Sequence, residues 1–488
     1  MAIFFFFAFL YFVCYTKKNL PFCSTAVNEI SKICLQKGEL TIMKIFNSII
    51  TGILLLCFIH LYAFSFMFPN ISSLKYLLYI LGGIFFLFIN FSPNIIPDKN
   101  TPLRNRILAE GTLLLQLFLF TTLLSVLFGI YFAYQTIPDN ITAFLFHLVL
   151  VILMESVLFW NGILRVYATS IQLGIKWRIL GVICGWIPII QLFSLVHIIR
   201  LTRQEAAFEK EKYLFALKHQ HEELCKTKYP LLFVHGVFFR DFHFLNYWGR
   251  IPEELQKYGA TIFYGNQQSA ASVAACGEEL AQRIQAILQE TNAEKVNIIA
   301  HSKGGLDSRY AISQLNMAPY VASLTTINTP HQGCIFADYL LDTLPKSFCD
   351  SIASKYNAAL KKAGDFDPDF LSAVNDLTAS SCQDRNSLLS DAPEVFCQSV
   401  GSKMNHASSG KFPLNVSYPL VKHFDGENDG LVSTESMKWG EDFIFISTPT
   451  GRGISHGDMI DLNRENISGF DVREFYVNLV HDLKERGL

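Results

Sequence analysis

The chain has 488 residues, of which 51% are hydrophobic, 14% are aromatic and only 17% are charged. Soluble domains contain about 25% charged residues, so this composition excludes an ordinary soluble protein and predicts that part of the chain faces lipid. The formal net charge of −2 provides no attraction for phosphates, which argues against nucleic-acid binding.

The first 44 residues form an N-terminal segment that is open to two interpretations. Residues 1–15 are almost entirely apolar, but they are short for a membrane span and no basic residue precedes them. A second methionine, Met43, stands directly before Lys44 and the first long apolar run. Residues 1–44 are therefore a candidate for absence from the mature chain, with Met43 as an alternative start.

Residues 45–200 are predicted to form a multi-pass transmembrane domain. Apolar runs of bilayer-spanning length, nearly free of charge, cover residues 45–69, 76–92, 111–138, 140–164 and 179–199. So many apolar runs leave no polar face to keep a helical bundle in water. We therefore expect an all-α domain of about five spanning helices.

Lysine and arginine residues are distributed unevenly over the connecting loops. Those before the first run, between the second and third runs, and between the fourth and fifth runs fall on one side if the helices alternate. Because positively charged loops stay in the cytoplasm, this favours a plasma-membrane protein whose C-terminal half lies outside the cytoplasm. The opposite orientation is favoured by four basic residues after the last run: Arg200, Arg203, Lys210 and Lys212.

Glu155 is the acidic residue inside the fourth apolar run. A carboxyl group in hydrocarbon is costly and marks a functional or packing position. Because no second charge lies within these runs to pair with it, packing or hydrogen bonding is favoured over a transport path. Residues 201–228 then read as a polar helical linker.

Residues 229–488 have the alternating pattern of an α/β domain. Strand-length apolar runs cover residues 231–234, 260–264, 295–300 and 321–327. Helical patterns lie between them at residues 275–290 and 306–315. Strands that alternate with helices predict a mostly parallel sheet.

Ser302 lies at the junction of one such strand and the helix that follows it. A strand, then small-x-Ser-x-Gly, then a helix is the pattern of a nucleophile elbow, in which Ala300 and Gly304 permit a sharp turn. The alternative is a serine that only caps the helix.

An acid and a histidine follow Ser302 in the order expected for a Ser-acid-His triad. Asp429 lies in Asn-Asp-Gly-Leu-Val and His456 in Gly-Ile-Ser-His-Gly-Asp. In this arrangement His456 takes the proton from Ser302, and Asp429 orients the imidazole. Asp425 is the rival acid, because Asn-Asp-Gly is also an ordinary turn sequence. The backbone amides of Lys303 and Val237 would form the oxyanion hole.

Six sequence blocks resemble the bacterial triacylglycerol lipases, in particular their Pseudomonas and Bacillus branches. They are Leu231-Leu-Phe-Val-His-Gly236, Asn246-Tyr-Trp-Gly249, Ala300-His-Ser-Lys-Gly-Gly305, Thr325-Thr-Ile-Asn-Thr-Pro-His331, Asn428-Asp-Gly-Leu-Val432 and Ser455-His-Gly-Asp458. The resemblance covers residues 229–488. It implies an α/β-hydrolase fold, serine esterase chemistry on long-chain esters, and a helical lid over residues 337–410.

The same resemblance bears on cofactors and on neighbouring side chains. It implies that no cofactor is required, with Asp458 as a ligand of a possible structural calcium ion. The second acidic calcium ligand of the Pseudomonas branch is missing, because Ser408-Ser409-Gly410 stands in its place. His235 is expected to shape the turn after the first strand, and His301 and His331 to support the site.

Eleven cysteines are present and no C-x-x-C pair occurs among them. Two states remain open for four of them, a disulfide if the domain is extracytoplasmic or reduced and buried thiols. These are Cys334, Cys349, Cys382 and Cys397.

We therefore predict a membrane-anchored serine hydrolase that cleaves carboxylic esters of lipids. An acyltransferase or deacylase acting on a lipid-linked surface molecule is one alternative, because the sequence does not separate water from an alcohol as acceptor. A non-catalytic membrane sensor with a hydrolase-like domain is the other. The expected partners are the lipid or ester substrate and the membrane, and the sequence gives no indication of a protein partner.

Overall fold

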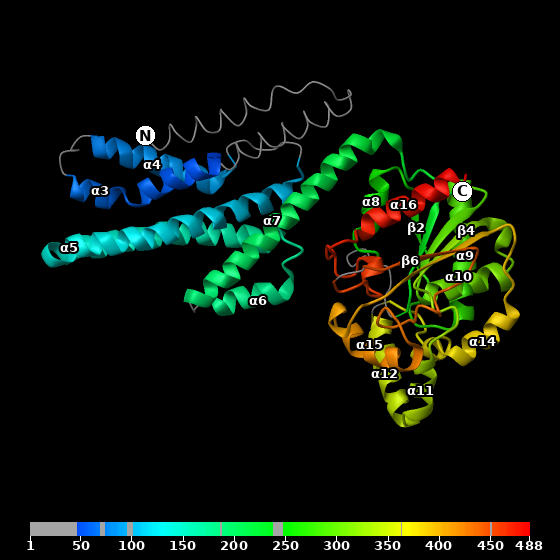
Figure 1. Cartoon of the computed structure of the whole chain (residues 1–488). Coiled ribbons are helices and arrows are strands. Elements are labelled where there is room, and N and C mark those ends of the chain that lie inside the picture. The colour runs from blue at the N-terminus through cyan, green and yellow to red at the C-terminus, as the bar shows by residue number, and fades with distance from the viewer. Residues whose placement is uncertain are drawn as a thin grey trace, which may run out of the picture. The chain divides into compact units, whose positions relative to one another are not determined.

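The computed structural model describes residues 46–68, 74–94, 101–185, 188–237, 247–362, 364–448 and 451–488. The N-terminal segment 1–44 lies outside the described residues. The chain divides into two compact units, unit 1 (Met1–Ala206) and unit 2 (Ala207–Leu488). Figure 1 shows that unit 1 is helical and that unit 2 contains the strands.

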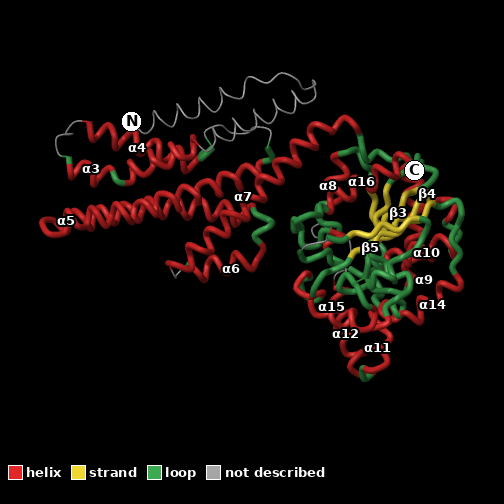
Figure 2. The backbone as a smooth tube through the Cα atoms, in the orientation of Figure 1, coloured by secondary structure: helices red, strands yellow, loops and turns green. Residues whose placement is uncertain are grey.

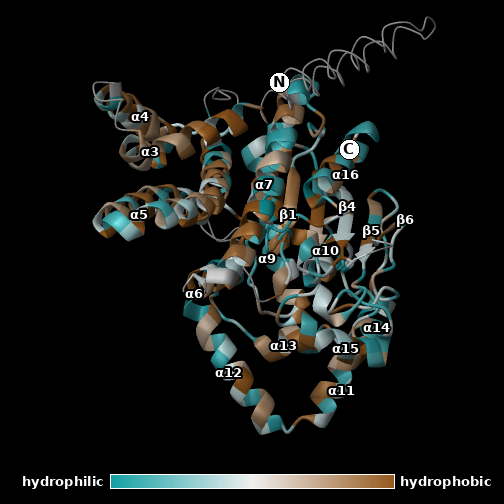
Figure 3. Ribbon diagram, turned by 60° about the vertical axis from the view of Figure 1, so that its left-hand side comes forward, coloured by the Kyte–Doolittle hydropathy of each residue, from teal (hydrophilic) through white to brown (hydrophobic). Residues whose placement is uncertain are grey.

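The described part of unit 1 consists of mostly apolar helices of very different lengths (Figure 3). A helix at Phe46–Ile59 is followed by α3 (Leu61–Met67), α4 (Leu74–Phe91), α5 (Leu103–Thr169), α6 (Gly174–Cys184) and the beginning of α7 (Pro188–His219). Helix α6 has no fully buried residue.

Helix α5 folds back on itself and consists of two antiparallel helical arms. Its backbone is non-helical at Asn140, with φ −152° and ψ 75°, two residues after Pro138. Glu110 near one end pairs with Arg165 near the other at 2.7 Å. A Cβ atom on Gly111 would lie 3.0 Å from the Gly162 carbonyl oxygen, so the arms cross closely where both residues are small. The predicted runs 111–138 and 140–164 are thus separate helical arms.

The prediction of five spanning helices is not supported. Among the described helices, α5 is the one that is long and apolar enough to cross a membrane. The helix Phe46–Ile59 and α3 would be a second candidate if together they form one span, which is bent by 56°. The physical reason is that the other runs are short or broken: α4 has 18 residues, and the fifth run is divided between α6 and α7. Only 22% of the most apolar window of α5 is buried inside the protein.

Unit 2 contains a sheet of six parallel strands in the order β2-β1-β3-β4-β5-β6. Figure 2 shows the strands in yellow, gathered together within unit 2. The strands are β1 (Leu231–Val234), β2 (Ile262–Tyr264), β3 (Val296–His301), β4 (Val321–Ile327), β5 (Phe396–Ser402) and β6 (Asp442–Ile446). The carboxyl ends of parallel strands lie at one edge of the sheet, where α/β proteins place their sites.

Helices cover both faces of this sheet. Alternate residues of β1 point to opposite faces: Phe233 packs with α8 (Ile251–Lys257) and α16 (Val472–Glu485), whereas Leu232 packs with α9 (Val273–Thr291) and α10 (Lys303–Gln314). Strands β1, β3 and β4 are buried at every residue, and β1 therefore reads as a continuous apolar run.

The predicted strands 231–234 and 321–327 have the observed bounds, whereas β5 and β6 were not predicted. Strand β5 lies inside residues 337–410, so the predicted lid is too long. The helical insertion consists of α11 (Ile335–Thr343), α12 (Lys346–Lys362), α13 (Phe370–Asn375) and α14 (Ala379–Leu388). The sequence did not predict β5 because this strand carries polar residues. In the structure these residues are buried and paired, such as Gln398 with Thr325 at 2.9 Å.

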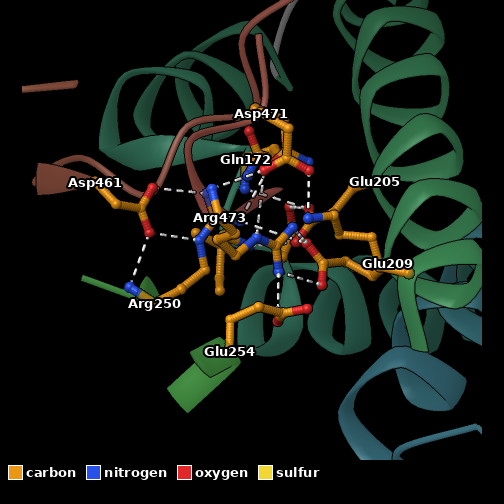
Figure 4. A network of polar contacts seen from close by, with 12 residues as sticks. Gln172, Glu205, Glu209, Arg250, Glu254, Asp461, Asp471 and Arg473 are labelled. Atoms are coloured by element: carbon orange, nitrogen blue, oxygen red, sulfur yellow. Dashed lines mark hydrogen bonds and ion pairs between the residues drawn. The ribbon is translucent and has the colours of Figure 1, made fainter. Parts of the chain in front are cut away.

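The remaining helices of unit 2 include α15 (Leu414–Asp425) and the C-terminal part of α7. In that part of α7, Glu209 accepts hydrogen bonds from both terminal nitrogens of Arg473, at 2.9 and 3.2 Å (Figure 4). Arg250 binds both carboxylate oxygens of Asp461 at 2.7 and 2.8 Å. The Arg250–Asp461 pair ties the loop that follows His456 to the beginning of α8, and the Glu209–Arg473 pair ties α7 to α16.

Candidate active site

Ser302 occupies a strained turn between β3 and α10. Its φ of 55° and ψ of −130° lie in a region that L-residues seldom adopt, which is typical of a nucleophile elbow. A Cβ atom on Gly304 would lie 2.4 Å from the carbonyl oxygen of His235, so only glycine permits this approach to β1. The structure confirms the predicted strand-turn-helix setting of Ser302.

Asp429 and His456 form a buried hydrogen-bonded pair, with Nδ1 of His456 2.6 Å from Oδ2 of Asp429. The backbone amide of His456 also donates to the Asp429 carbonyl at 2.9 Å. Oδ1 of Asp429 accepts the amides of Leu431 and Val432 at 2.9 and 2.8 Å. A carboxylate that accepts this many donors is held in one orientation, and it holds one imidazole tautomer.

Asn328 is a member of the site that the sequence analysis missed. It follows β4 directly, and its Nδ2 donates to Oδ2 of Asp429 at 2.7 Å. The same amide contacts the Ser402 hydroxyl at the end of β5. The signal available in the sequence was its place inside the Thr-Thr-Ile-Asn-Thr-Pro-His block.

His456 lies next to the elbow through its contact with His301. Nε2 of His301 lies 3.2 Å from the carbonyl oxygen of His456, and the two rings are 4.5 Å apart. Among the described residues no hydrogen bond joins the Ser302 hydroxyl to His456. Catalytic hydrogen bonds are often long before substrate binds, so this geometry is compatible with a triad.

Tyr247 is a second member that sequence reasoning did not single out. Its hydroxyl lies 2.7 Å from Nδ1 of His301 and accepts the amide of Gly236 at 3.0 Å. Burial, and then the neighbouring His456, lower the pKa of His301 well below its ordinary value. A neutral His301 accepts from Tyr247 and donates to His456, so Tyr247 connects the turn after β1 to the predicted base.

The predicted oxyanion donors flank Ser302. Lys303 is the first residue of α10, where backbone amides have no partner within the helix. A Cβ atom on Gly236 would lie 2.9 Å from Cβ of Ser302, which places the turn that holds Val237 against the elbow. The structure thus places the chain before Val237 and at Lys303 close to Ser302, and the role of the two amides as oxyanion donors stays a prediction.

The side chain of Lys303 does not take part in this arrangement. Its ammonium group is buried and lies 2.7 Å from Asp307 one turn along α10. Burial opposes the charge on Lys303, but the Asp307 carboxylate more than offsets it, so the pKa of Lys303 is raised. The side chain of Lys303 is thus engaged by Asp307, and only its backbone amide remains as the predicted oxyanion donor.

His235 lies in the turn after β1, as expected, whereas the described contacts of His331 are with β4 and Trp439, so its supporting role stays a prediction. Burial lowers the pKa of His235 to about 4, and its ring nitrogens lie 2.8 and 3.0 Å from the carbonyls of Gly236 and Gln267. Nε2 of His331 lies 2.9 Å from the Thr326 hydroxyl, and its ring stacks on Trp439.

Asp425, the alternative candidate for the catalytic acid, has a structural role instead. Its carboxylate accepts the backbone amides of Ile335 and Phe336 at 3.1 and 3.2 Å. These are orphan donors of the first turn of α11, so Asp425 caps the helix that begins the insertion. Among the described contacts, none joins it to His456.

The surroundings of Asp458 do not fit the calcium site that the resemblance implies. The guanidinium of Arg452 binds both oxygens of Asp458 at 2.9 Å, and the amide and hydroxyl of Ser455 donate to Oδ2 at 2.8 and 2.7 Å. A cation is therefore already paired with this carboxylate. The described part of the chain holds no group of three or more His, Cys, Asp or Glu arranged to bind a metal.

The sequence left open whether four cysteines form disulfides or are reduced, and in the structure all four are free thiols: Cys334, Cys349, Cys382 and Cys397. Burial raises the pKa of Cys382 to about 11 and that of Cys397 to about 12. Thiols with such a pKa are protonated at neutral pH and poorly reactive.

Comparison with known proteins gives matches in unit 2. Residues 254–362 match the family model described as "Putative serine esterase (DUF676)", a range that contains Ser302 but ends before Asp429 and His456. A triacylglycerol lipase of Pseudarthrobacter phenanthrenivorans is 35% identical over 167 residues, 32% of this chain and 51% of the relative. Triacylglycerol lipase 2 of Saccharomyces cerevisiae is 27% identical over 262 residues, 50% of this chain and 74% of the relative.

The chain spans about half the length of the bacterial lipases that it matches, since the lipase of Burkholderia plantarii, also 35% identical, is covered over 46% of its length. Among solved structures, the mature lipase BlEst2 of Bacillus licheniformis superposes with a TM-score of 0.39 at 20% identity. That superposition covers 52% of this chain and 92% of the lipase.

Proposed function

We propose that this chain is a serine hydrolase that cleaves carboxylic ester bonds of lipids. The observation that carries the proposal is the buried Asp429–His456 pair held beside the strained Ser302 turn. The similarity of unit 2 to serine esterases and triacylglycerol lipases supports the same chemistry.

In the proposed reaction the hydroxyl of Ser302 attacks the ester carbonyl and His456 takes its proton. The carbonyl oxygen becomes an oxyanion, which the backbone amides of Lys303 and Val237 stabilise. His456 then protonates the leaving alcohol, and an acyl-enzyme remains on Ser302. Water, activated by the same histidine, hydrolyses the acyl-enzyme and releases the fatty acid.

We further propose that unit 1 anchors the enzyme in a membrane. Large apolar side chains of α4 and α5 are exposed, such as Phe91 at 87% and Leu127 at 65%, and water would make this costly. An enzyme anchored in lipid has its substrates beside it without passage through water. We take the extracytoplasmic side predicted from the sequence as the hypothesis for unit 2; because that prediction counted five spans, the labelling test decides it.

The test is fluorophosphonate labelling of intact cells with a membrane-impermeant and a permeant probe, together with hydrolysis of trioleoylglycerol by the purified protein. We expect both probes to label Ser302 and the protein to sediment with membranes after alkaline carbonate treatment. Absence of labelling at Ser302 would contradict the proposed chemistry. Labelling by the permeant probe alone would place unit 2 in the cytoplasm, and release by carbonate would exclude the anchor.

We propose that the activity needs no metal, because Arg452 already pairs with the Asp458 carboxylate. Chelation by EGTA is expected to leave the rate of ester hydrolysis unchanged. The variant Arg452→Ala leaves the buried Asp458 carboxylate without its cationic partner and is expected to lower the free energy of unfolding by about 3 kcal/mol. The matched control is Lys411→Ala, which removes a surface partner of Glu465. Loss of activity with EGTA and its recovery with calcium would contradict the proposal.

A further inference from the structure

Unit 1 contains a cavity of about 540 Å³ between the two arms of α5. Most of its wall is apolar, with residues such as Phe118, Ile130 and Ile152. Polar side chains also reach it, among them Ser125, Glu155 and His147. Sites for small molecules in proteins have about this size, 300–1,000 Å³, and this same mixture of an apolar wall and a few polar groups.

Glu155 is satisfied by hydroxyl groups from the facing arm. Thr121 and Thr122 donate to its Oε2 at 2.9 and 3.0 Å, and Ser125 donates to its Oε1 at 3.2 Å. Glu155 is 6% exposed. The role of hydrogen bonding that the sequence favoured for this residue is what the structure shows.

The hydrogen-bonded chain continues from Ser125 through two buried histidines. Nε2 of His60 lies 2.9 Å from the Ser125 hydroxyl, and its Nδ1 lies 3.2 Å from Nε2 of His147. His60 and His147 are 1% and 2% exposed. Nδ1 of His147 ends the chain, because it has no hydrogen-bond partner among the residues that the structure describes.

The open end of the chain needs a partner in either protonation state of Glu155. If Glu155 is ionised, Ser125 donates to it, each histidine donates toward Ser125, and Nδ1 of His147 is an unused acceptor. If Glu155 is protonated, every bond can reverse and the same Nδ1 becomes an unused donor. A hydroxyl group both donates and accepts, so it satisfies Nδ1 in both states. A buried polar atom without a partner costs about 1–3 kcal/mol, so such a ligand gains affinity there.

We propose that this cavity binds a long-chain glyceride with a free hydroxyl, a monoacylglycerol or a diacylglycerol. Its hydroxyl group contacts Nδ1 of His147 and its acyl chain lies against the apolar wall. A fatty-acid anion is disfavoured, because the wall of this cavity already carries the Glu155 carboxyl group and its described lining includes no lysine or arginine to pair with a second carboxylate. The inference uses the proposed lipid environment of unit 1 but not the proposed chemistry at Ser302.

The experiment is photo-crosslinking of the full chain, carrying Ser302→Ala so that the probe is not hydrolysed, in phosphatidylcholine nanodiscs. The probe is monooleoylglycerol with a diazirine in its acyl chain, and adducts are located by peptide mass spectrometry. We expect adducts within residues 118–159 that unlabelled monooleoylglycerol competes away and methyl oleate, which lacks the hydroxyls, does not. Equal competition by methyl oleate would mean non-specific contact with lipid and would overturn the proposal.

Two variants test the two halves of the site. His147→Phe removes the hydrogen-bonding end of the chain and is expected to lower adduct yield about tenfold. Gly129→Leu leaves the polar chain intact and fills the cavity, since Gly129 lines it and has open space beyond its Cα. The matched control His197→Phe keeps the ring that stacks on Trp177 and is expected to label normally.

Full labelling of Gly129→Leu would overturn the proposal even if His147→Phe failed to fold. Folding of each variant is checked by the melting temperature of the purified protein, which must match that of the parent chain. Because the crosslinking protein lacks the serine, failure of the proposed hydrolase activity does not affect this result.

Discussion

Replacement of Ser302 by alanine is expected to reduce kcat for ester hydrolysis by about 10⁴–10⁶-fold. The acyl-enzyme cannot form without the Ser302 hydroxyl, and no neighbouring group on the elbow replaces it. The oxyanion donors at Lys303 and Val237 remain, so the variant is expected to keep a residual rate above that of water. The measurement is the initial rate on p-nitrophenyl butyrate and on trioleoylglycerol, with fluorophosphonate labelling in parallel.

Ser313→Ala is the matched control, because Ser313 lies on the same helix and its hydroxyl accepts hydrogen bonds from the Ser390 backbone amide and the Gln314 side chain, neither of which belongs to the site. Its rate is expected to stay within about twofold of the parent chain, as for most surface changes. If the Ser302→Ala protein kept full activity, or if both variants lost activity alike, Ser302 would not be the nucleophile.

Replacement of Asp429 by asparagine is expected to reduce kcat by about 10⁴-fold while the protein stays folded. Asparagine has nearly the same shape, but its amide no longer fixes the proton of His456 on Nδ1, so Nε2 is not held ready to accept a proton from Ser302. In the structure Oδ2 of Asp429 accepts hydrogen bonds from both His456 and Asn328, so the substitution changes the group that orients His456. The rate and the melting temperature are measured together.

The control for this prediction is Asp425→Asn, which changes the rival acid. Asp425 accepts two amides of α11, and an asparagine oxygen can accept one of them. We expect a modest loss of stability, about 1 kcal/mol, and a rate within a few-fold of the parent. A larger loss of rate in Asp425→Asn than in Asp429→Asn would reverse the assignment.

The sequence was most informative where a pattern depends on neighbours along the chain. The bounds of β1 and β4 and the turn at Ser302 were predicted because continuous apolar runs and small residues act locally. Strand β5 was not predicted because its Gln398 and Ser399 are polar. Only pairing with the neighbouring strand and loop makes their burial acceptable.

The same limit explains the helical unit. Apolar composition predicted membrane-type helices, but hydropathy alone does not show where a helix turns back, as α5 does at Asn140. It also does not show which helices are too short or too broken to cross a bilayer. Glu155 was read as a lone charge because its partners, the hydroxyls of Thr121, Thr122 and Ser125, lie more than two dozen residues away along the chain.

By itself, then, the sequence determined the residue types and the order Ser302, Asp429, His456, which are properties of the chain read from end to end. The tertiary structure alone decided that Asp429 rather than Asp425 binds His456, and that Asn328 and Tyr247 support the site. It also decided that Arg452 occupies the place beside Asp458. Hydrogen bonds and ion pairs form between groups a few ångströms apart, and separation along the chain does not determine that distance.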